Sequence, residues 1–136
     1  MTSQVFIGKF SSLANIAELV RGAAAEAGFD STAIYQIETA VDEACSNIIE
    51  HAYGGESERT FEVLLDVTGS ALTITLVDEG KPFKPVKNRK PNLQAALKDR
   101  DNHGLGLYFM QQWMDEVEYA HSGGRNVLKM IKRVGV

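Results

Sequence analysis

The sequence of 136 residues contains little of what defines secreted, membrane-spanning or cross-linked proteins. Cys45 is the only cysteine, so no disulfide can form within the chain, and a reducing, cytoplasmic environment is expected. No apolar run approaches the roughly 18 residues of a membrane span. The N-terminus also lacks a basic region followed by an apolar run, as a signal peptide would have. These absences predict a cytoplasmic protein that does not bind membranes.

Proline is also scarce, and its distribution follows that of basic charge. All three prolines lie between residues 81 and 103, together with seven of the 14 basic residues and two of the 18 acidic ones. This segment carries a net charge of +5, whereas the rest of the chain carries −9. It is either a solvated linker, the more common meaning of such composition, or a loop that closes over an anion. No other region is basic enough for a nucleic-acid-binding face, so direct nucleic-acid binding is not expected.

Apolar periodicity predicts a single α+β domain over residues 1–136. The strands are expected at residues 4–10, 61–67, 72–77, 117–120 and 126–132, and the helices at 13–27, 31–53 and 105–114. Ser11 or Ser12 is expected to cap the first helix, and Gly28 to end it. This order predicts a two-layer sandwich, in which an antiparallel or mixed sheet carries helices on one face.

Asp78 is placed by the alternation of its strand. It follows Leu72, Ile74 and Leu76 at period two, so the pattern carries its carboxylate to the buried face where the strand ends. A buried carboxylate needs a donor, such as an amide or an exocyclic amine from a ligand, and Gly80 would let a flat ring approach the backbone. The alternative, in which Asp78 turns outward or caps the next turn, fits the pattern equally well.

Glu43 and Asn47 lie one turn apart on the second predicted helix. At about 100° per residue they share a narrow stripe with Ala40 and His51, beside the apolar face. A carboxylate next to a carboxamide could serve as a base beside a metal ligand. Solvated side chains on a polar helix flank are the more common meaning of such a pair. For His51, a structural role is more common than a place at a pocket rim.

The segment His103-Gly104-Leu105-Gly106-Leu107 places two glycines directly before a predicted helix. Backbone N–H groups at the positive end of a helix form a natural phosphate site. The segment is not the dinucleotide-binding fingerprint, because no third glycine follows at the right place, and it lacks the Gly-Lys-Ser/Thr of a Walker loop. A plain hinge between loop and helix is the alternative.

Three segments, in this order, resemble the ATP-binding superfamily of gyrase, histidine kinases and mismatch-repair ATPases (GHKL). They are Glu43-Ala-Cys-Ser-Asn47, Asp78-Glu-Gly80-Lys-Pro82-Phe83 and Gly104-Leu-Gly106-Leu107. Within this superfamily, the short single-domain length, the stretch VDEACSNIIEHAY and the later PFKP resemble the bacterial anti-sigma serine/threonine kinases of partner-switching systems. The resemblance spans nearly the whole chain, and three motifs in register are specific.

The resemblance implies a Bergerat-type ATP-binding fold that uses ATP and Mg²⁺. It implies that Glu43 is the general base for a serine hydroxyl on the partner, that Asn47 coordinates Mg²⁺, and that Asp78 holds the adenine amine. Further nucleotide contacts are implied for Gly80, Pro82, Phe83, Gly104, Leu105, Gly106 and Leu107. The basic segment, at about residues 84–103, would form the lid over the phosphates.

The implied function is that of an ATP-binding serine/threonine kinase that acts as an anti-sigma regulatory factor. It would phosphorylate an anti-anti-sigma (STAS-like) protein and alternately sequester a sigma factor, with Arg21 of the first helix at the partner surface. The resemblance also suggests a homodimer. Two alternatives are a nucleotide-binding partner-switching module without kinase activity and the catalytic domain of a sensor histidine kinase. Retention of Glu43 and Asn47 favours the enzyme, and the lack of a helical hairpin with a phosphoacceptor histidine argues against the sensor kinase.

Two positions depart from the superfamily pattern. The superfamily often has a threonine just after a late glycine, near the adenine, whereas this sequence has Gly124-Arg125-Asn126-Val127 there. Pro82 stands where a second glycine is common, although a Pro-Phe pair at this place also resembles many anti-sigma relatives. The sequence alone therefore leaves open which group replaces the threonine.

Overall fold

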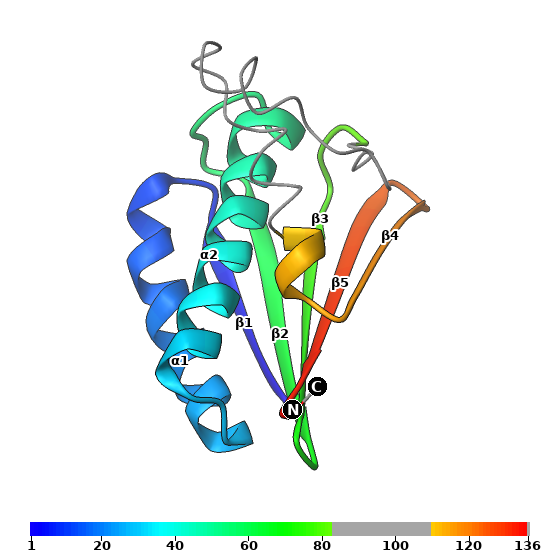
Figure 1. Ribbon diagram of the computed structural model, residues 1–136. Coiled ribbons are helices and arrows are strands. Elements are labelled where there is room, and N and C mark those ends of the chain that lie inside the picture. Colours follow the sequence, from blue (N-terminus) through cyan, green and yellow to red (C-terminus); the bar gives the residue numbers. More distant parts are fainter. Residues whose placement is uncertain (83–109, 136) are drawn as a thin grey trace, which may run out of the picture.

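The computed structural model describes residues 1–82 and 110–135, and these form a sheet with helices on one side (Figure 1). The strands are β1 (Thr2–Ile7), β2 (Thr60–Thr68), β3 (Ala71–Asp78), β4 (Glu116–Ser122) and β5 (Arg125–Arg133). The helices are a 3-10 turn η1 (Phe10–Ser12), α1 (Leu13–Ala27), α2 (Ser31–Asn47) and a π-helical turn η2 (Ile48–Ala52) that continues α2. A further helical turn covers residues 110–113.

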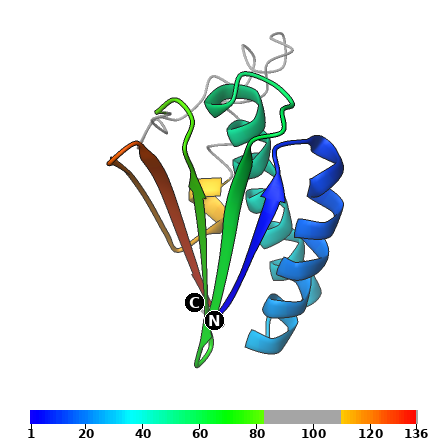
Figure 2. The same cartoon turned by 180° about the vertical axis from the view of Figure 1, so that it is seen from behind.

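The sheet has the order β1-β2-β3-β5-β4, and every neighbouring pair is antiparallel. Helices α1 and α2 lie on one face, with the turn at 110–113 on the same side, and the opposite view shows the other face of the sheet uncovered (Figures 1 and 2). The α+β two-layer sandwich predicted from the sequence is confirmed. Of the two sheet types that the sequence allowed, the structure has the antiparallel one.

The core lies between this sheet face and the two long helices. Alternate residues of the central strands point into it, as period-two patterning requires. The buried strand residues are Phe61, Val63, Leu65, Leu72, Ile74, Leu76 and Met130. They pack against the apolar stripes of the helices, which consist of Ile16, Val20, Ala24, Ile37, Val41, Ala44 and Cys45.

The ends of the elements follow local chemistry, with one correction. Gly28 ends α1 with a φ of 98°, and the Asp30 side chain caps α2 by accepting a hydrogen bond of 2.8 Å from Ala33 N. The predicted serine cap of the first helix is wrong. Ser12 is itself helical, and its hydroxyl donates to Ile7 O over 2.8 Å. Residues 10–12 therefore turn into the helix directly, and β1 ends at Ile7 rather than at residue 10.

Several predictions fall outside the described residues. These are the lid at about 84–103, the first half of the helix at 105–114, and the site residues Phe83, Gly104, Leu105, Gly106 and Leu107. Where that predicted helix is described, Met110 and Met114 are buried in the core. Within residues 1–82 and 110–135, no helix is long and apolar enough to cross a membrane.

Candidate functional site

Asp78 is the last residue of β3, and its side chain lies on the helix-covered face, 5% exposed. The side chain is buried, as the alternation predicted, and it also caps the next turn, as the alternative predicted, since its Oδ1 accepts from Gly80 N. Antiparallel register places Asn126 of β5 opposite Asp78, and His121 of β4 opposite Asn126. The three side chains therefore form a row across the end of three strands. We call Asp78, Gly80, Lys81, Tyr119, His121 and Asn126 the strand-end cluster.

The donors for the Asp78 carboxylate come first from the protein itself. Oδ1 accepts a hydrogen bond of 2.8 Å from Gly80 N and another of 2.8 Å from Asn126 Nδ2. Across the described residues, no hydrogen bond reaches Oδ2. The buried charge that the sequence predicted is therefore half satisfied by the fold, and one oxygen keeps its capacity to accept.

Gly80 is required by the approach of the backbone of η2. A Cβ at this position would lie 2.4 Å from Ala52 O and 2.6 Å from Ala52 C, which is closer than real contacts allow. Lys81 N donates to the same Ala52 carbonyl over 2.9 Å. A carbonyl in the last turn of a helix has no partner within the helix, so this bond ties the end of β3 to the end of the α2–η2 helix. A ring against Gly80, as the resemblance implied, stays a prediction.

Asn47, the last residue of α2, carries a buried oxygen to which none of the described residues donates. The residue is 5% exposed, and its Oδ1 is buried and accepts no hydrogen bond within the part of the chain that the structure describes. Glu43, one turn earlier, and His51, in η2, are half-buried. We call Glu43, Asn47 and His51 the helix stripe. A buried acceptor without a donor costs about 1–3 kcal/mol, so the oxygen fits a group that arrives from outside.

The π-helical turn begins directly after Asn47. Tyr53 N donates to Ile48 O over 2.9 Å, five residues back rather than four. Such turns are rare in proteins overall, and many of those that occur lie at functional sites. Here the turn carries Ala52 against Gly80, and it thereby brings the helix stripe and the strand-end cluster to the same end of the molecule.

The donor set suits a hard cation that shares its ligands with a substrate. Among the described residues, no group of three or more His, Cys, Asp or Glu side chains could hold a metal. Mg²⁺ does not need such a cage, because it keeps several waters and commonly takes one or two protein oxygens together with phosphate oxygens. The buried Oδ1 of Asn47 fits that role.

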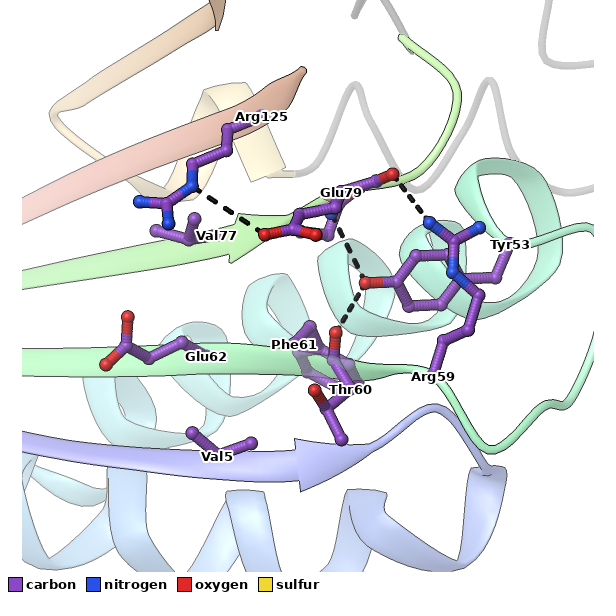
Figure 3. Close-up of a pocket in the computed structure, with 10 residues that line it drawn as sticks. Val5, Tyr53, Arg59, Thr60, Phe61, Glu62, Val77, Glu79 and Arg125 are labelled. Atoms are coloured by element: carbon purple, nitrogen blue, oxygen red, sulfur yellow. Dashed lines mark hydrogen bonds and ion pairs between the residues drawn. The ribbon is translucent and has the colours of Figure 1, made fainter. Parts of the chain in front are cut away.

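A pocket of about 390 Å³ opens on the other face of the sheet and shares only Asp78 with the predicted site residues that the structure describes. Figure 3 shows Val5, Glu62 and Val77 on the strands that line it, with the helices behind. Asp78 lines it at the end of β3, whereas Glu43, Asn47 and Gly80 do not. The helix stripe therefore lies outside this pocket.

The polar groups of this outer pocket are occupied with one another. Tyr53 Oη donates to Thr60 O over 2.5 Å and accepts from Glu79 N over 3.3 Å, and burial raises the pKa of this hydroxyl. Arg59 lies 4.3 Å from the centre of the Tyr53 ring and donates to Glu79 O over 2.6 Å. Arg125 Nε lies 3.8 Å from Glu79 Oε1. These contacts stabilise the end of β3 on the face of the sheet that the helices do not cover.

Of the remaining predicted residues, Pro82 is exposed at the last described position before residue 110. The sequence did not identify Asn126 as a partner of Asp78, nor Tyr119 and His121 as partners of Asn126. Asn126 begins the same alternation that identified Asp78, since Leu128 and Met130 follow it at period two. That signal was present, but only the strand register shows that Asn126 faces Asp78.

The chain is similar in sequence to a family of ATP-binding domains. The family described as "Histidine kinase-like ATPase domain" matches residues 9–132. An anti-sigma F factor of Thermoanaerobacter sp. (strain X514) is 31% identical over 103 residues, which is 75% of this chain and 71% of that protein. The serine-protein kinase RsbW of Bacillus velezensis is 31% identical over 110 residues, which is 78% of this chain and 69% of that protein.

A solved structure supports the fold. The RsbU and RsbW domains of a Mycobacterium tuberculosis protein match 98% of this chain with a TM-score of 0.62 and 18% sequence identity. This chain spans 32% of that longer one. At this identity the likeness concerns the arrangement of the sheet and helices and not the chemistry of the site.

Proposed function

Because the chain belongs to the family of histidine kinase-like ATPase domains, as its motifs predicted, we propose that it is an ATP-dependent serine/threonine kinase that acts as an anti-sigma regulatory factor. The observation that carries the proposal is the buried, unpartnered Oδ1 of Asn47, four residues after Glu43. A pure interaction surface has no use for a buried acceptor of this kind, whereas a Mg²⁺-nucleotide site does.

Asp78 and Gly80 would form the base end of the site. Oδ2 of Asp78, as a carboxylate oxygen, would take a hydrogen bond from the exocyclic amine of adenine. A guanine base would present a carbonyl oxygen there and be repelled. The hydrogen bonds from Gly80 N and Asn126 Nδ2 hold the carboxylate in place before the ligand arrives.

Glu43 and Asn47 would form the reacting end. A serine hydroxyl is a poor nucleophile at neutral pH, so a positioned base that accepts its proton speeds the transfer. Glu43 would be that base, and Asn47 would hold the cation through Oδ1. When bound, Mg²⁺ would neutralise charge on the transferring phosphate group. Phe83, Gly104, Leu105, Gly106, Leu107 and the lid at about 84–103 remain proposals from the resemblance.

The proposed partners are a STAS-like anti-anti-sigma protein as substrate and a sigma factor that is bound and released. Arg21 of α1, proposed at the partner surface, pairs with Glu38 of α2 over 2.6 Å and keeps 57% of its side chain exposed. Its position is therefore fixed by the fold, while its guanidinium group stays accessible to a second protein.

The test is phosphate transfer run beside nucleotide binding. Purified chain, labelled ATP, Mg²⁺ and a STAS-like protein from the same organism should give a labelled serine, and calorimetry should show ATP and ADP binding that strengthens with Mg²⁺. Binding of nucleotide without transfer to any such partner would support the catalytically silent partner-switching module. Failure of the folded chain to bind either nucleotide would contradict the proposal as a whole.

A further inference from the structure

Asn126 is the most fully hydrogen-bonded polar side chain of the strand-end cluster. It is 2% exposed. Its Nδ2 donates to Asp78 Oδ1 over 2.8 Å, to Lys81 O over 3.1 Å and to Gly80 O over 3.2 Å. Its Oδ1 accepts from Tyr119 Oη over 2.8 Å and lies 2.7 Å from Nδ1 of His121. One carboxamide thus joins the end of β3 and the turn after it to β5 and β4.

These partners determine which way the carboxamide points. Three oxygen acceptors surround Nδ2, and two groups able to donate surround Oδ1. The reverse orientation would set the amide oxygen against a carboxylate and two carbonyls, so the network assigns the orientation. It follows that Nδ1 of His121 carries a proton, in either the neutral or the charged form of the ring.

The orientation of the Asn126 carboxamide determines which oxygen of Asp78 can bind a ligand. Oδ1 of Asp78 is committed to two N–H donors, which fixes the rotation of the carboxylate and leaves Oδ2 to receive a ligand donor. A hydroxyl at position 126 could donate one proton only, whereas the amide has two, which it shares among Asp78 Oδ1 and the carbonyls of residues 80 and 81. At the stretch where the superfamily often has a threonine, this chain therefore has a residue that fixes the Asp78 carboxylate.

We propose that Asn126 is a positioning residue for base recognition. It holds the Asp78 carboxylate so that Oδ2 selects a purine with an exocyclic amine at C6 over one with a carbonyl there. Tyr119 and His121 support it by fixing the orientation of its carboxamide. This inference rests on the proposed nucleotide site, and it concerns which residue of this chain gives that site its selectivity.

The experiment compares binding of ADP and of inosine diphosphate, whose base has a C6 carbonyl in place of the amine. Isothermal titration calorimetry on the full chain would use wild type, Asn126→Leu, Asp78→Asn and the double variant, with exposed Asn15→Leu of α1 as the matched control. We expect Asn126→Leu to weaken ADP binding by about tenfold or more and to reduce the ratio of the affinity for ADP to that for inosine diphosphate. Asn15→Leu should change neither.

The double variant distinguishes positioning from mere structural support. If Asn126 acts through Asp78, its replacement should change ADP affinity by less than about twofold in the Asp78→Asn background. Equal fold-losses in both backgrounds, and equal losses for the two nucleotides, would overturn the inference. So would unchanged binding by Asn126→Leu. Failure of folded wild type to bind ADP would instead overturn the proposed function and this inference with it.

A second readout needs no nucleotide and keeps the inference testable if Asn126→Leu binds poorly because it is unstable. At alkaline pH, nitrogen NMR of the free wild-type protein should show neutral His121 protonated at Nδ1, because Asn126 Oδ1 requires a donor there. Asn126→Thr, which retains a small polar side chain, serves as a milder variant for calorimetry. An Nε2–H form of His121 in wild type would contradict the assigned orientation and the proposal built on it.

Discussion

The strand-end cluster and the helix stripe each contain a buried asparagine, yet the two asparagines differ in how their hydrogen bonds are satisfied. Asn126 uses both its donor and its acceptor groups within the fold. Asn47 leaves a buried oxygen without a donor in the described structure. A satisfied network is rigid before any ligand binds, whereas an unsatisfied acceptor lowers stability until a ligand supplies the partner. The comparison therefore predicts a preformed base site beside a phosphate and metal site that binding completes.

The largest expected effect concerns catalysis at the helix stripe. Glu43→Gln keeps the shape of the side chain and removes its ability to accept a proton, so transfer to the STAS-like partner should slow by about 10²-fold or more. Affinity for ADP, measured by calorimetry, should stay within about twofold of wild type, because the residues proposed to bind the adenine are unchanged. Transfer at the wild-type rate would exclude Glu43 as the base.

The next effect is a contrast in stability between two asparagines. Asn126→Leu leaves the donors and acceptors around residue 126 without partners. Each unsatisfied group costs about 1–3 kcal/mol, so the free energy of unfolding should fall by about 3 kcal/mol or more. Asn47→Leu removes an acceptor that had no donor, so stability without ligand should stay equal or rise by up to about 1 kcal/mol.

Urea unfolding of the two variants without nucleotide measures this contrast. Asn47→Leu should at the same time lose the part of nucleotide affinity that depends on Mg²⁺. A large loss of stability in Asn47→Leu would mean that its oxygen is satisfied in the free protein, and the distinction between the two regions would then fail.

How far the sequence predicts this molecule can be judged from single residues. Period two identified Asp78 as inward-facing, and the end of α1 at Gly28 was visible because helix ends depend on local chemistry. Ser12 has the right residue type for a cap, but a carbonyl in β1 takes its hydroxyl. Asn126 was seen only as a departure, because its role depends on the pairing of β3 with β5 across 48 residues of chain.

The reason for a glycine at position 80 likewise depends on a contact between distant parts of the chain, and it provides the next prediction. Gly80→Ala would place a methyl group 2.4 Å from Ala52 O, so the end of β3 or η2 must shift. Overpacking of this kind typically costs 1–3 kcal/mol. Gly22→Ala on α1 is the matched control, since a Cβ there meets nothing within 4 Å.

That control should raise the free energy of unfolding by about 0.5–1 kcal/mol through helix propensity. Thermal or urea unfolding of both variants checks the pair. If Gly80→Ala were as stable as wild type, the tie between the strand-end cluster and η2 would be looser than the structure indicates. Nucleotide affinity should also fall in Gly80→Ala, because Gly80 N is one of the two donors to Asp78.

The smallest effect depends on pH and concerns Cys45, which lies on α2 between Glu43 and Asn47 and is completely buried. Burial raises the pKa of its thiol far above the ordinary value, with a smaller contribution from the Asp42 carboxylate. The thiol ionises in the unfolded chain near pH 9 but stays protonated in the fold, so its contribution to stability is complete below that pH. It should then decline as pH rises.

Wild type should therefore lose up to about 1.4 kcal/mol per pH unit above about pH 9 that Cys45→Ala does not lose. The measurement is urea unfolding of both proteins between about pH 7 and 10.5. Comparing them removes the lysines and tyrosines that titrate in the same range, since these groups are common to both. If the free energies of unfolding of the two proteins changed with pH in parallel, the Cys45 thiol would ionise within the folded protein. The part of α2 that carries the helix stripe would then be less rigid than the burial of Cys45 indicates.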